Sequence, residues 1–112
     1  MGLDNFWSGS VEGDFKVCGG LCSGHGNDSF RGKVYNTFIE WNTGVSLYDD
    51  VIDNRTIRTI ADKLDKKIRE CTKDGTFESF CEFWNMDEHE MLDLSRMFRV
   101  HALAGHTLTS WY

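Results

Sequence analysis

Apolar residues in the second half of the chain recur at helical spacing, in segments that begin at Asp or Thr and end near glycine. The first of these faces is formed by Ile57, Ile60, Leu64 and Ile68. Asp53 or Asn54 precedes it as a typical N-cap, and Gly75 follows it as a stop signal. The pattern predicts one long amphipathic helix between these signals.

Two further helices are expected after Gly75. Thr76 can start a short helix that carries Phe77, Phe80, Cys81 and Trp84 on one stripe, with Phe83 outside that stripe. The segment from Asp87 to Glu90 then has capping-box spacing, with Asp in place of Ser or Thr. The stripe predicted for the last helix is Met91, Leu94, Phe98 and His101.

The first half reads as short strands and one helix. Residues 5–7 and 14–17 flank a glycine-containing loop and predict a hairpin. Asp28 or Ser29 can cap a helix that ends near Gly44, with a face formed by Phe30, Val34, Phe38 and Trp41. A brief extended segment is expected over 45–48, and a final strand over 107–112.

These elements predict an α+β fold. We expect a small antiparallel sheet of N- and C-terminal strands, packed against about four helices in one domain over residues 1–112. Trp7 and Trp111 are expected to close the core where the two terminal strands pair. No apolar run approaches a membrane span and the start lacks a leader pattern, so we expect a soluble cytoplasmic protein with reduced thiols.

Charge is distributed unevenly along the chain. Residues 53–73 carry seven bases and four acids, whereas 74–95 carry seven acids and no lysine or arginine. The simpler interpretation is that two neighbouring helices of opposite charge pack side by side. The functional interpretation is that one of these faces is a docking surface for a charged partner. The net charge of −6 and the acids within the basic run disfavour nucleic-acid binding.

Two thiols and an imidazole lie close together in a glycine-rich stretch. Cys18, Cys22 and His25 supply three of the four ligands of a tetrahedral zinc site, and the spacing is not diagnostic. The fourth ligand would be Cys71, Cys81, His101 or His106. The alternative is that both cysteines pack as small apolar residues and no cofactor is present.

The same glycine-rich stretch runs into a predicted helix start. Backbone N–H groups around Gly24 and Gly26, with Arg31 and Lys33, suit an anion or a nucleotide. The spacing differs from that of a P-loop. The alternative is a surface turn in which Gly32 lets the helix approach the sheet closely.

Catalysis has little support in the sequence. His89 begins a partial zinc-protease motif that lacks its second histidine, and His101 falls on an apolar helical face, where a core role is favoured. A pair such as Cys22 with His25 has no readable third group. We therefore assign no catalytic residue and regard an enzyme as the minority interpretation.

Three blocks of the chain resemble small uncharacterised proteins encoded by bacteriophages. They are GLDNFW (2–7), GDFKVCGGLC (13–22) with SFRGKVY (29–35), and HALAGHTLTSWY (101–112). The resemblance implies an intracellular accessory protein of a virus that acts in its bacterial host. It implies no activity and no site residue.

The function we predict is a non-catalytic binding module that contacts a host or viral protein. Its predicted contact residues are Glu78, Glu82, Phe83, Glu88 and Glu90, where acids lie beside aromatic side chains. A zinc-binding module and an anion-binding module are the alternatives. The partner is expected to be a protein, with a homodimer left open, and neither a nucleic acid nor a membrane is expected.

Overall fold

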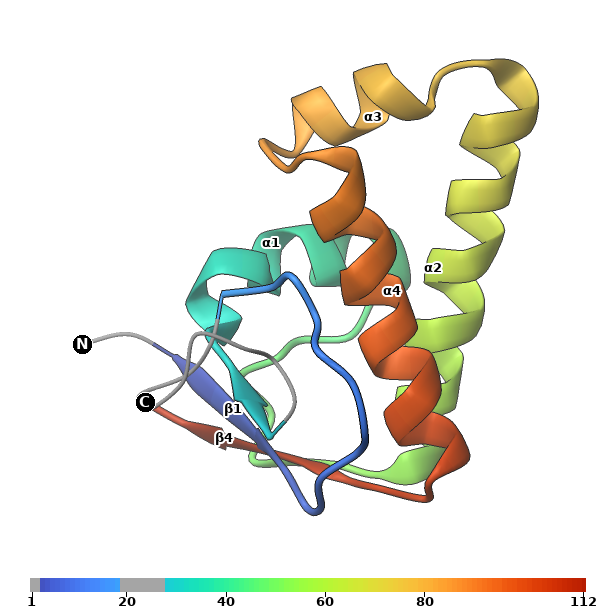
Figure 1. The fold of residues 1–112 in the computed structure, drawn as a ribbon. Coiled ribbons are helices and arrows are strands. Elements are labelled where there is room, and N and C mark those ends of the chain that lie inside the picture. Colours follow the sequence, from blue (N-terminus) through green and yellow to red (C-terminus); the bar gives the residue numbers. More distant parts are fainter. Residues whose placement is uncertain (1–2, 19–27) are drawn as a thin grey trace.

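The fold combines helices with one small sheet, as predicted. The structure is a computed structural model, and it describes residues 3–18 and 28–112. Along the described chain the elements are β1 (Asp4–Trp7), β2 (Ser29–Phe30), α1 (Gly32–Thr43), β3 (Val51–Ile52), α2 (Asn54–Asp74), α3 (Phe77–Phe83), α4 (Glu88–Leu103) and β4 (Leu108–Trp111) (Figure 1).

The sheet joins the two ends of the chain. Its strand order is β2-β1-β4-β3 and every pairing is antiparallel. The central pair sets Asp4 opposite Trp111 and Trp7 opposite Leu108, which confirms the predicted pairing of N- and C-terminal strands. The buried Asn5 amide donates to the Leu47 carbonyl at 3.0 Å and so ties β1 to the loop before β3.

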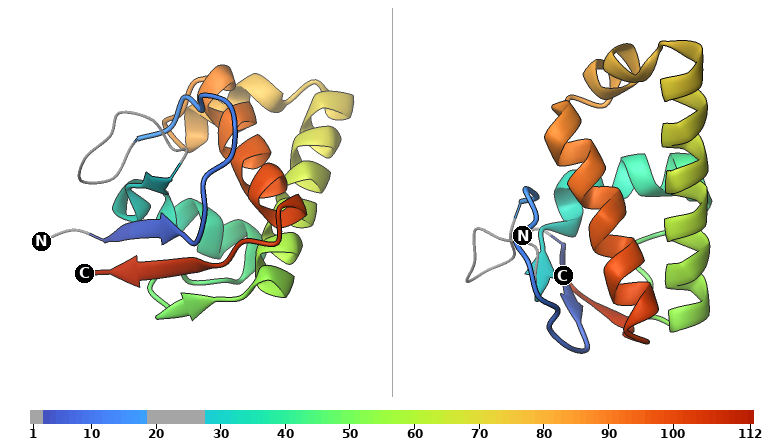
Figure 2. Two further views of the ribbon diagram at one scale, coloured as in Figure 1. Left: turned by 60° about the horizontal axis from the view of Figure 1, so that its bottom comes forward. Right: turned by 45° about the vertical axis from the view of Figure 1, so that its right-hand side comes forward.

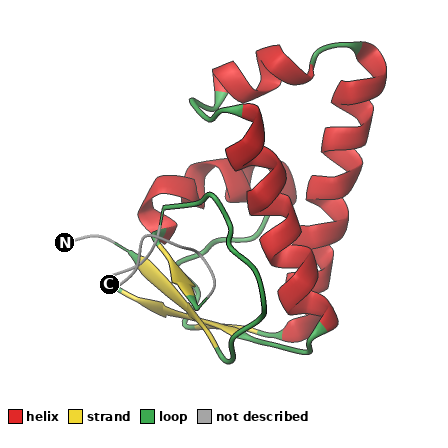
Figure 3. Ribbon diagram, viewed as in Figure 1, coloured by secondary structure: helices red, strands yellow, loops and turns green. Residues whose placement is uncertain are grey.

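The helices cover one face of the sheet (Figures 2 and 3). On that face Trp7, Ile52 and Leu108 are buried. Successive side chains of a strand point to opposite faces. In β4, Trp111 follows Leu108 by three positions, so its side chain points to the opposite face, away from the helices. Trp111 is therefore 65% exposed, and the expectation that it closes the core was wrong, whereas Trp7 is buried as expected.

The three helices of the second half follow their sequence signals. The Asp53 carboxylate accepts from the Thr56 N–H at 2.8 Å, and the Asp87 carboxylate accepts from the Glu90 N–H at 2.7 Å. Gly75 ends α2 in a left-handed conformation. The apolar stripes predicted for α2 and α4 are buried, except that Ile68 is half-buried.

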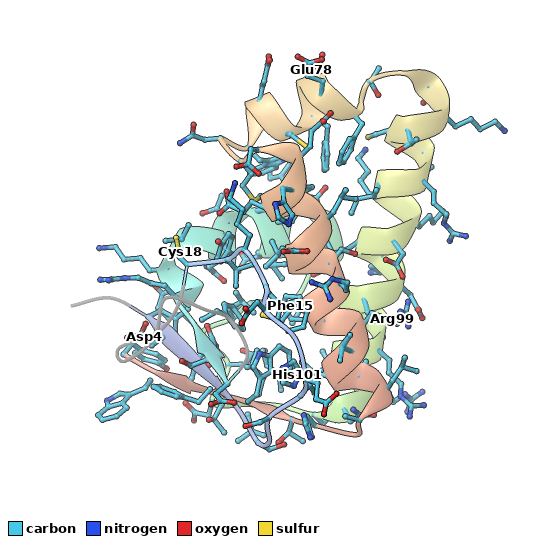
Figure 4. The ribbon with its side chains drawn as sticks, viewed as in Figure 1. Asp4, Phe15, Cys18, Glu78, Arg99 and His101 are labelled. Carbon is cyan, nitrogen blue, oxygen red and sulfur yellow. The ribbon has the colours of Figure 1, made fainter. Side chains whose placement is uncertain are left out.

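The predicted hairpin is wrong in its second strand. Residues 14–17 form no strand, and β1 pairs with β2 and β4 instead. Phe15 and Val17 bury their side chains, and Phe15 points into the interior (Figure 4). The backbone N–H of Lys16 donates to the Asp93 carboxylate at 2.7 Å, so a side chain of α4 replaces the strand partner.

The first helix begins later than predicted. Ser29 and Phe30 form β2, and α1 starts at Gly32 after Arg31, so neither Asp28 nor Ser29 caps it. A Cβ on Gly32 would lie 1.8 Å from the Asn5 Oδ1, which explains the glycine as a close approach of helix and sheet. The expected extended segment at 45–48 forms no strand, and the strand of this region is β3.

The buried face of α1 also differs from the prediction. Tyr35, Phe38 and Ile39 face the core, whereas Val34 and Trp41 are exposed. Only Phe38 of the predicted stripe is therefore a core residue of this helix. The consequence for function is that Trp41 is free to take part in a surface.

Candidate functional site

A hollow of about 400 Å³ lies where α1, α2 and α3 meet. It is lined by Trp41 and Asn42 of α1, by Lys67 and Cys71 of α2, and by Thr76, Ser79, Phe80, Phe83 and Trp84 of α3 and its ends. Aromatic rings supply much of this lining. Such a hollow offers contact area to an apolar group rather than a set of acid and base groups.

The rings of the hollow divide into anchored and exposed members. Trp84 contacts the buried Phe38 edge-on, with centroids 5.3 Å apart, and Phe80 lies 5.9 Å from Phe38. Phe83 contacts Trp84 at 5.1 Å and 80°. Phe83 and Trp41 are left 77% and 79% exposed. Two rings of the hollow are thus held by the core, and two extend from it into solvent.

Exposed acidic side chains lie on α3, which also carries Phe80 and Phe83, and at the start of α4, outside the lining of the hollow. Glu78, Glu82 and Glu88 are exposed, and Glu78 points away from the body of the molecule at the end farthest from the sheet (Figure 4). Among the described residues, none of these three carboxylates takes part in an ion pair. We call the "α3 surface" the set formed by Trp41, Phe83, Trp84, Glu78, Glu82 and Glu88.

Three other acids of residues 74–95 are engaged within the fold. Asp87 pairs with the Lys16 ammonium at 2.7 Å, and Asp93 pairs with Arg96 at 3.2 Å. The Lys16 hydrogen bond, followed by the Glu90 N–H, lowers the pKa of Asp87. Glu90 accepts from the Tyr35 hydroxyl at 2.6 Å. Glu90 therefore lies apart from the other predicted contact residues, on the side of α4 that faces α1.

The expected pairing of the basic segment with the acidic one does not form. Across the part of the chain that the structure describes, no ion pair joins a base of 53–73 to an acid of 74–95. Instead the two acids Asp62 and Asp65 of α2 pair with Arg99 of α4, at 2.6 and 2.8 Å. Glu78, Glu82 and Glu88 therefore remain accessible to solvent or to a partner.

One cation does lie at the hollow. The Lys67 ammonium sits 5.7 Å from the centroid of the Phe80 ring. It lies on the α2 side of the hollow, whereas the carboxylates of Glu78, Glu82 and Glu88 lie on α3 and α4 outside the lining. Burial, and then the nearby Glu88, raises the pKa of the Cys81 thiol to about 11, so this thiol is neutral at pH 7.

A second hollow lies between α2 and α4, with a volume of about 520 Å³. Its lining includes Arg96 and Arg99, which suggest an anion site at first sight. Both guanidinium groups already pair with Asp side chains, Arg96 with Asp93 and Arg99 with Asp62 and Asp65. Arg69, the third arginine of the lining, is exposed and pairs with no carboxylate in the described residues, so the uncompensated positive charge of this hollow comes from that one side chain.

The zinc prediction falls partly outside the described residues, because Cys22 and His25 lie there. Cys18 is exposed next to α1 (Figure 4). Within residues 3–18 and 28–112, no group of three His, Cys, Asp or Glu side chains is arranged to hold a metal ion. The candidates for a fourth ligand, Cys71 and Cys81, are buried.

The two other candidate ligands form a buried aromatic cluster. His101 is fully buried and stacks on Trp7 with centroids 4.0 Å apart. Its Nδ1 lies 2.8 Å from the Nδ1 of His106, so one ring donates a proton and the other accepts it. This contact supports the core role that the helical pattern indicated for His101.

The residues of the predicted anion site also lie partly outside the described residues. Gly24 and Gly26 lie outside the described residues, and Arg31 and Lys33 are exposed at the start of α1. The Arg31 N–H donates to the Cys18 carbonyl at 2.8 Å, and the Lys33 N–H donates to the Leu3 carbonyl at 3.0 Å. Two N–H groups at this helix start are therefore used within the chain and do not face an anion.

The sequence predicted Phe83 and the three carboxylates as contact residues, and it placed Trp41 on the apolar face of a helix instead. Helical spacing is consistent with two possible apolar faces of α1. One contains Phe38 and Trp41, and the other contains Phe38, Tyr35 and Ile39. Tyr35, with a hydroxyl that needs a buried partner, gave no local sign that Glu90 supplies one.

No helix among the described residues is both long enough and apolar enough to cross a membrane. No protein family, no curated protein and no solved structure matches this chain.

Proposed function

We propose that this protein is a small acidic binding module, without catalytic activity, that contacts another protein through the α3 surface. One observation carries the proposal. Trp41 and Phe83 come from two different helices, line one hollow, and are 79% and 77% exposed. Exposed aromatic side chains that gather in one place are typical of protein interfaces.

These two exposed rings contribute little to the free energy of folding. Fully burying a Phe side chain contributes about 1.5–3 kcal/mol. Phe83 keeps most of its surface in water, so it contributes only a minor part of that value to folding. A partner that covers the ring would gain the remainder, which makes Phe83 an anchor for binding rather than for the fold.

The resemblance to bacteriophage proteins suggests where the partner belongs. A viral accessory protein acts on a protein of the bacterial host or of the virus itself. A compact chain with an acidic, aromatic surface suits the occupation of a site on such a partner. The acidic charge of the surface makes a nucleic-acid partner unfavourable.

Site-specific photo-cross-linking tests the proposal. A photoreactive benzoylphenylalanine is placed at position 83, and in a matched variant at position 103, because Phe83 and Leu103 are 77% and 76% exposed on different helices. We expect position 83 to form a covalent adduct with a discrete protein in the bacterial host, and position 103 to form none. Equal adducts at both positions, or none at position 83, would contradict the proposal.

A further inference from the structure

We infer that the α3 surface binds a short basic segment of its partner, in which an apolar side chain is flanked by lysine or arginine. The inference rests on the proposed function and names the chemistry of the partner. It is carried by the contrast between the engaged and the unengaged acids of residues 74–95, and by the position of Lys67 on the α2 side of the hollow.

Charge points to a basic partner. Glu78, Glu82 and Glu88 are exposed, and in the described part of the chain no base pairs with them. Like charges gathered on one surface repel one another, so a cation brought beside them relieves repulsion and gains attraction. Opposite charges on two surfaces also raise the rate of association.

The rings point to an apolar side chain at the centre of that segment. Phe83 and Trp84 stand at 80° to each other and form two adjoining walls, and Trp41 of α1 lines the same hollow. An aliphatic or aromatic side chain inserted there is covered on several sides. An arginine at the border gains a further attraction by stacking on an exposed ring.

Lys67 sets the orientation of the segment. Its ammonium already lies over the Phe80 ring and repels a second cation on the α2 side. The bases of the partner therefore lie toward Glu78 and Glu82, and the apolar side chain lies nearest to Lys67. Removal of the Lys67 charge is expected to leave binding unchanged or to strengthen it.

A second copy of this chain is a poorer occupant. Its basic face is α2, and among the described residues none of the exposed large apolar side chains belongs to that helix. A copy of α2 would bring charge to the α3 surface without an anchor for the hollow. Self-association through this surface is therefore an outcome that would overturn the inference.

Selection from a library of random peptides of about 12 residues on the wild-type protein tests the inference, and each enriched peptide is then measured on the wild-type protein and on the Phe83→Ser variant. The enriched peptides are expected to carry an apolar residue next to two or more Lys or Arg. Their binding should weaken by about 10-fold or more with Phe83→Ser and with the triple variant Glu78→Gln, Glu82→Gln, Glu88→Gln. Leu103→Ser is the matched control and should leave binding unchanged, and circular dichroism checks that each variant is folded.

Salt and Lys67 provide independent readouts. Raising NaCl from about 0.05 M to about 0.5 M should weaken peptide binding to the wild-type protein more than to the triple variant. Lys67→Gln should not weaken it. Weaker binding by Lys67→Gln would overturn the proposed orientation.

The outcomes separate the two proposals. Enriched peptides that depend on Phe83 but are neutral or acidic would overturn the inference and leave the binding function standing. Peptides that bind Phe83→Ser as well as the wild-type protein would overturn both. A dimer seen by sedimentation that dissociates in the triple variant would show that the occupant is a second copy, and would also overturn the inference.

Discussion

Tyr35 connects three parts of the chain through a single hydroxyl group. The side chain is 0% exposed, its hydroxyl donates to the Glu90 carboxylate at 2.6 Å, and it accepts from the Cys18 N–H at 2.7 Å. Burial, and then the hydrogen bond to Glu90, raises the pKa of Tyr35 well above its usual value. The hydroxyl therefore keeps its proton at neutral pH and serves as a fixed donor.

The substitution Tyr35→Phe keeps the ring and removes only this hydroxyl. A neutral hydrogen bond contributes about 1 kcal/mol and one to a charged group about 1.5–3 kcal/mol. Glu90 is half-exposed, so water replaces part of what it loses, and we expect a total loss of about 2 kcal/mol in the free energy of unfolding. With an unfolding entropy of about 0.24 kcal/mol/K for a chain of this length, Tm should fall by about 8 °C.

Urea unfolding followed by circular dichroism measures this loss. Tyr112→Phe is the matched control, because Tyr112 is exposed and its stability effect should be near zero. Introducing Glu90→Gln into the wild-type protein and into Tyr35→Phe gives a double-mutant cycle that isolates the hydrogen bond between Tyr35 and Glu90. A loss below about 0.5 kcal/mol for Tyr35→Phe, or exchange of the Cys18 amide as slow as in the wild-type protein, would refute the reasoning.

Three further predictions follow from single contacts. Gly32→Ala places a Cβ 1.8 Å from the Asn5 Oδ1 and should destabilise the protein by more than about 2 kcal/mol in urea unfolding; an unchanged midpoint would show that β1 and α1 can separate. The Cys81 thiol, buried and with its pKa raised to about 11, should react with iodoacetamide at pH 8 much more slowly than the exposed Cys18, as read by peptide mass spectrometry; equal rates would contradict the assigned burial. The pKa of Asp87 is lowered on folding, so its ion pair stabilises the protein fully above the ordinary value of about 3.8 and is lost as pH falls through the lower folded value. The Tm difference between wild type and Asp87→Asn, which keeps a capping side chain, should accordingly shrink at low pH, and a constant difference would argue against the ion pair.

Local signals predicted the second half of the fold well. Asp53, Asp87 and Gly75 act within one or two turns of their own position, so their caps and stops can be read without knowledge of the rest of the chain. The same holds for the α4 stripe Met91, Leu94, Phe98 and His101, which recurs at helical spacing and is buried.

The first half depended on distant partners. Residues 14–17 alternate like a strand, yet the N–H groups of Lys16 and Cys18 are bound by side chains of α4 and α1. No local pattern specifies that Asp93 and Tyr35 provide these acceptors. The start of α1 shifted for a related reason, because Ser29 and Phe30 pair with β1 and cannot also enter the helix.

The candidate site was predictable in its charges and only partly in its rings. Phe83 departs from a well-defined stripe and could be identified as exposed, whereas Trp41 lies on a helix with two plausible faces. Glu90 shows the opposite error, since a carboxylate grouped with the contact residues by sequence alone turns toward a buried tyrosine.

The central pairing of β1 with β4 sets a condition on the order of folding. Asp4 meets Trp111, so this pairing waits until nearly the whole of the described chain has left the ribosome. Helices α2, α3 and α4 are consecutive in the sequence, and we expect them to assemble first, while the edge of β1 that later pairs with β4 stays unpaired. Pulse-labelling hydrogen exchange during refolding should protect α2 and α4 amides before those of β1, and simultaneous protection would contradict that order. Until β4 arrives, this edge of β1 is open to chaperones and to pairing with other nascent chains.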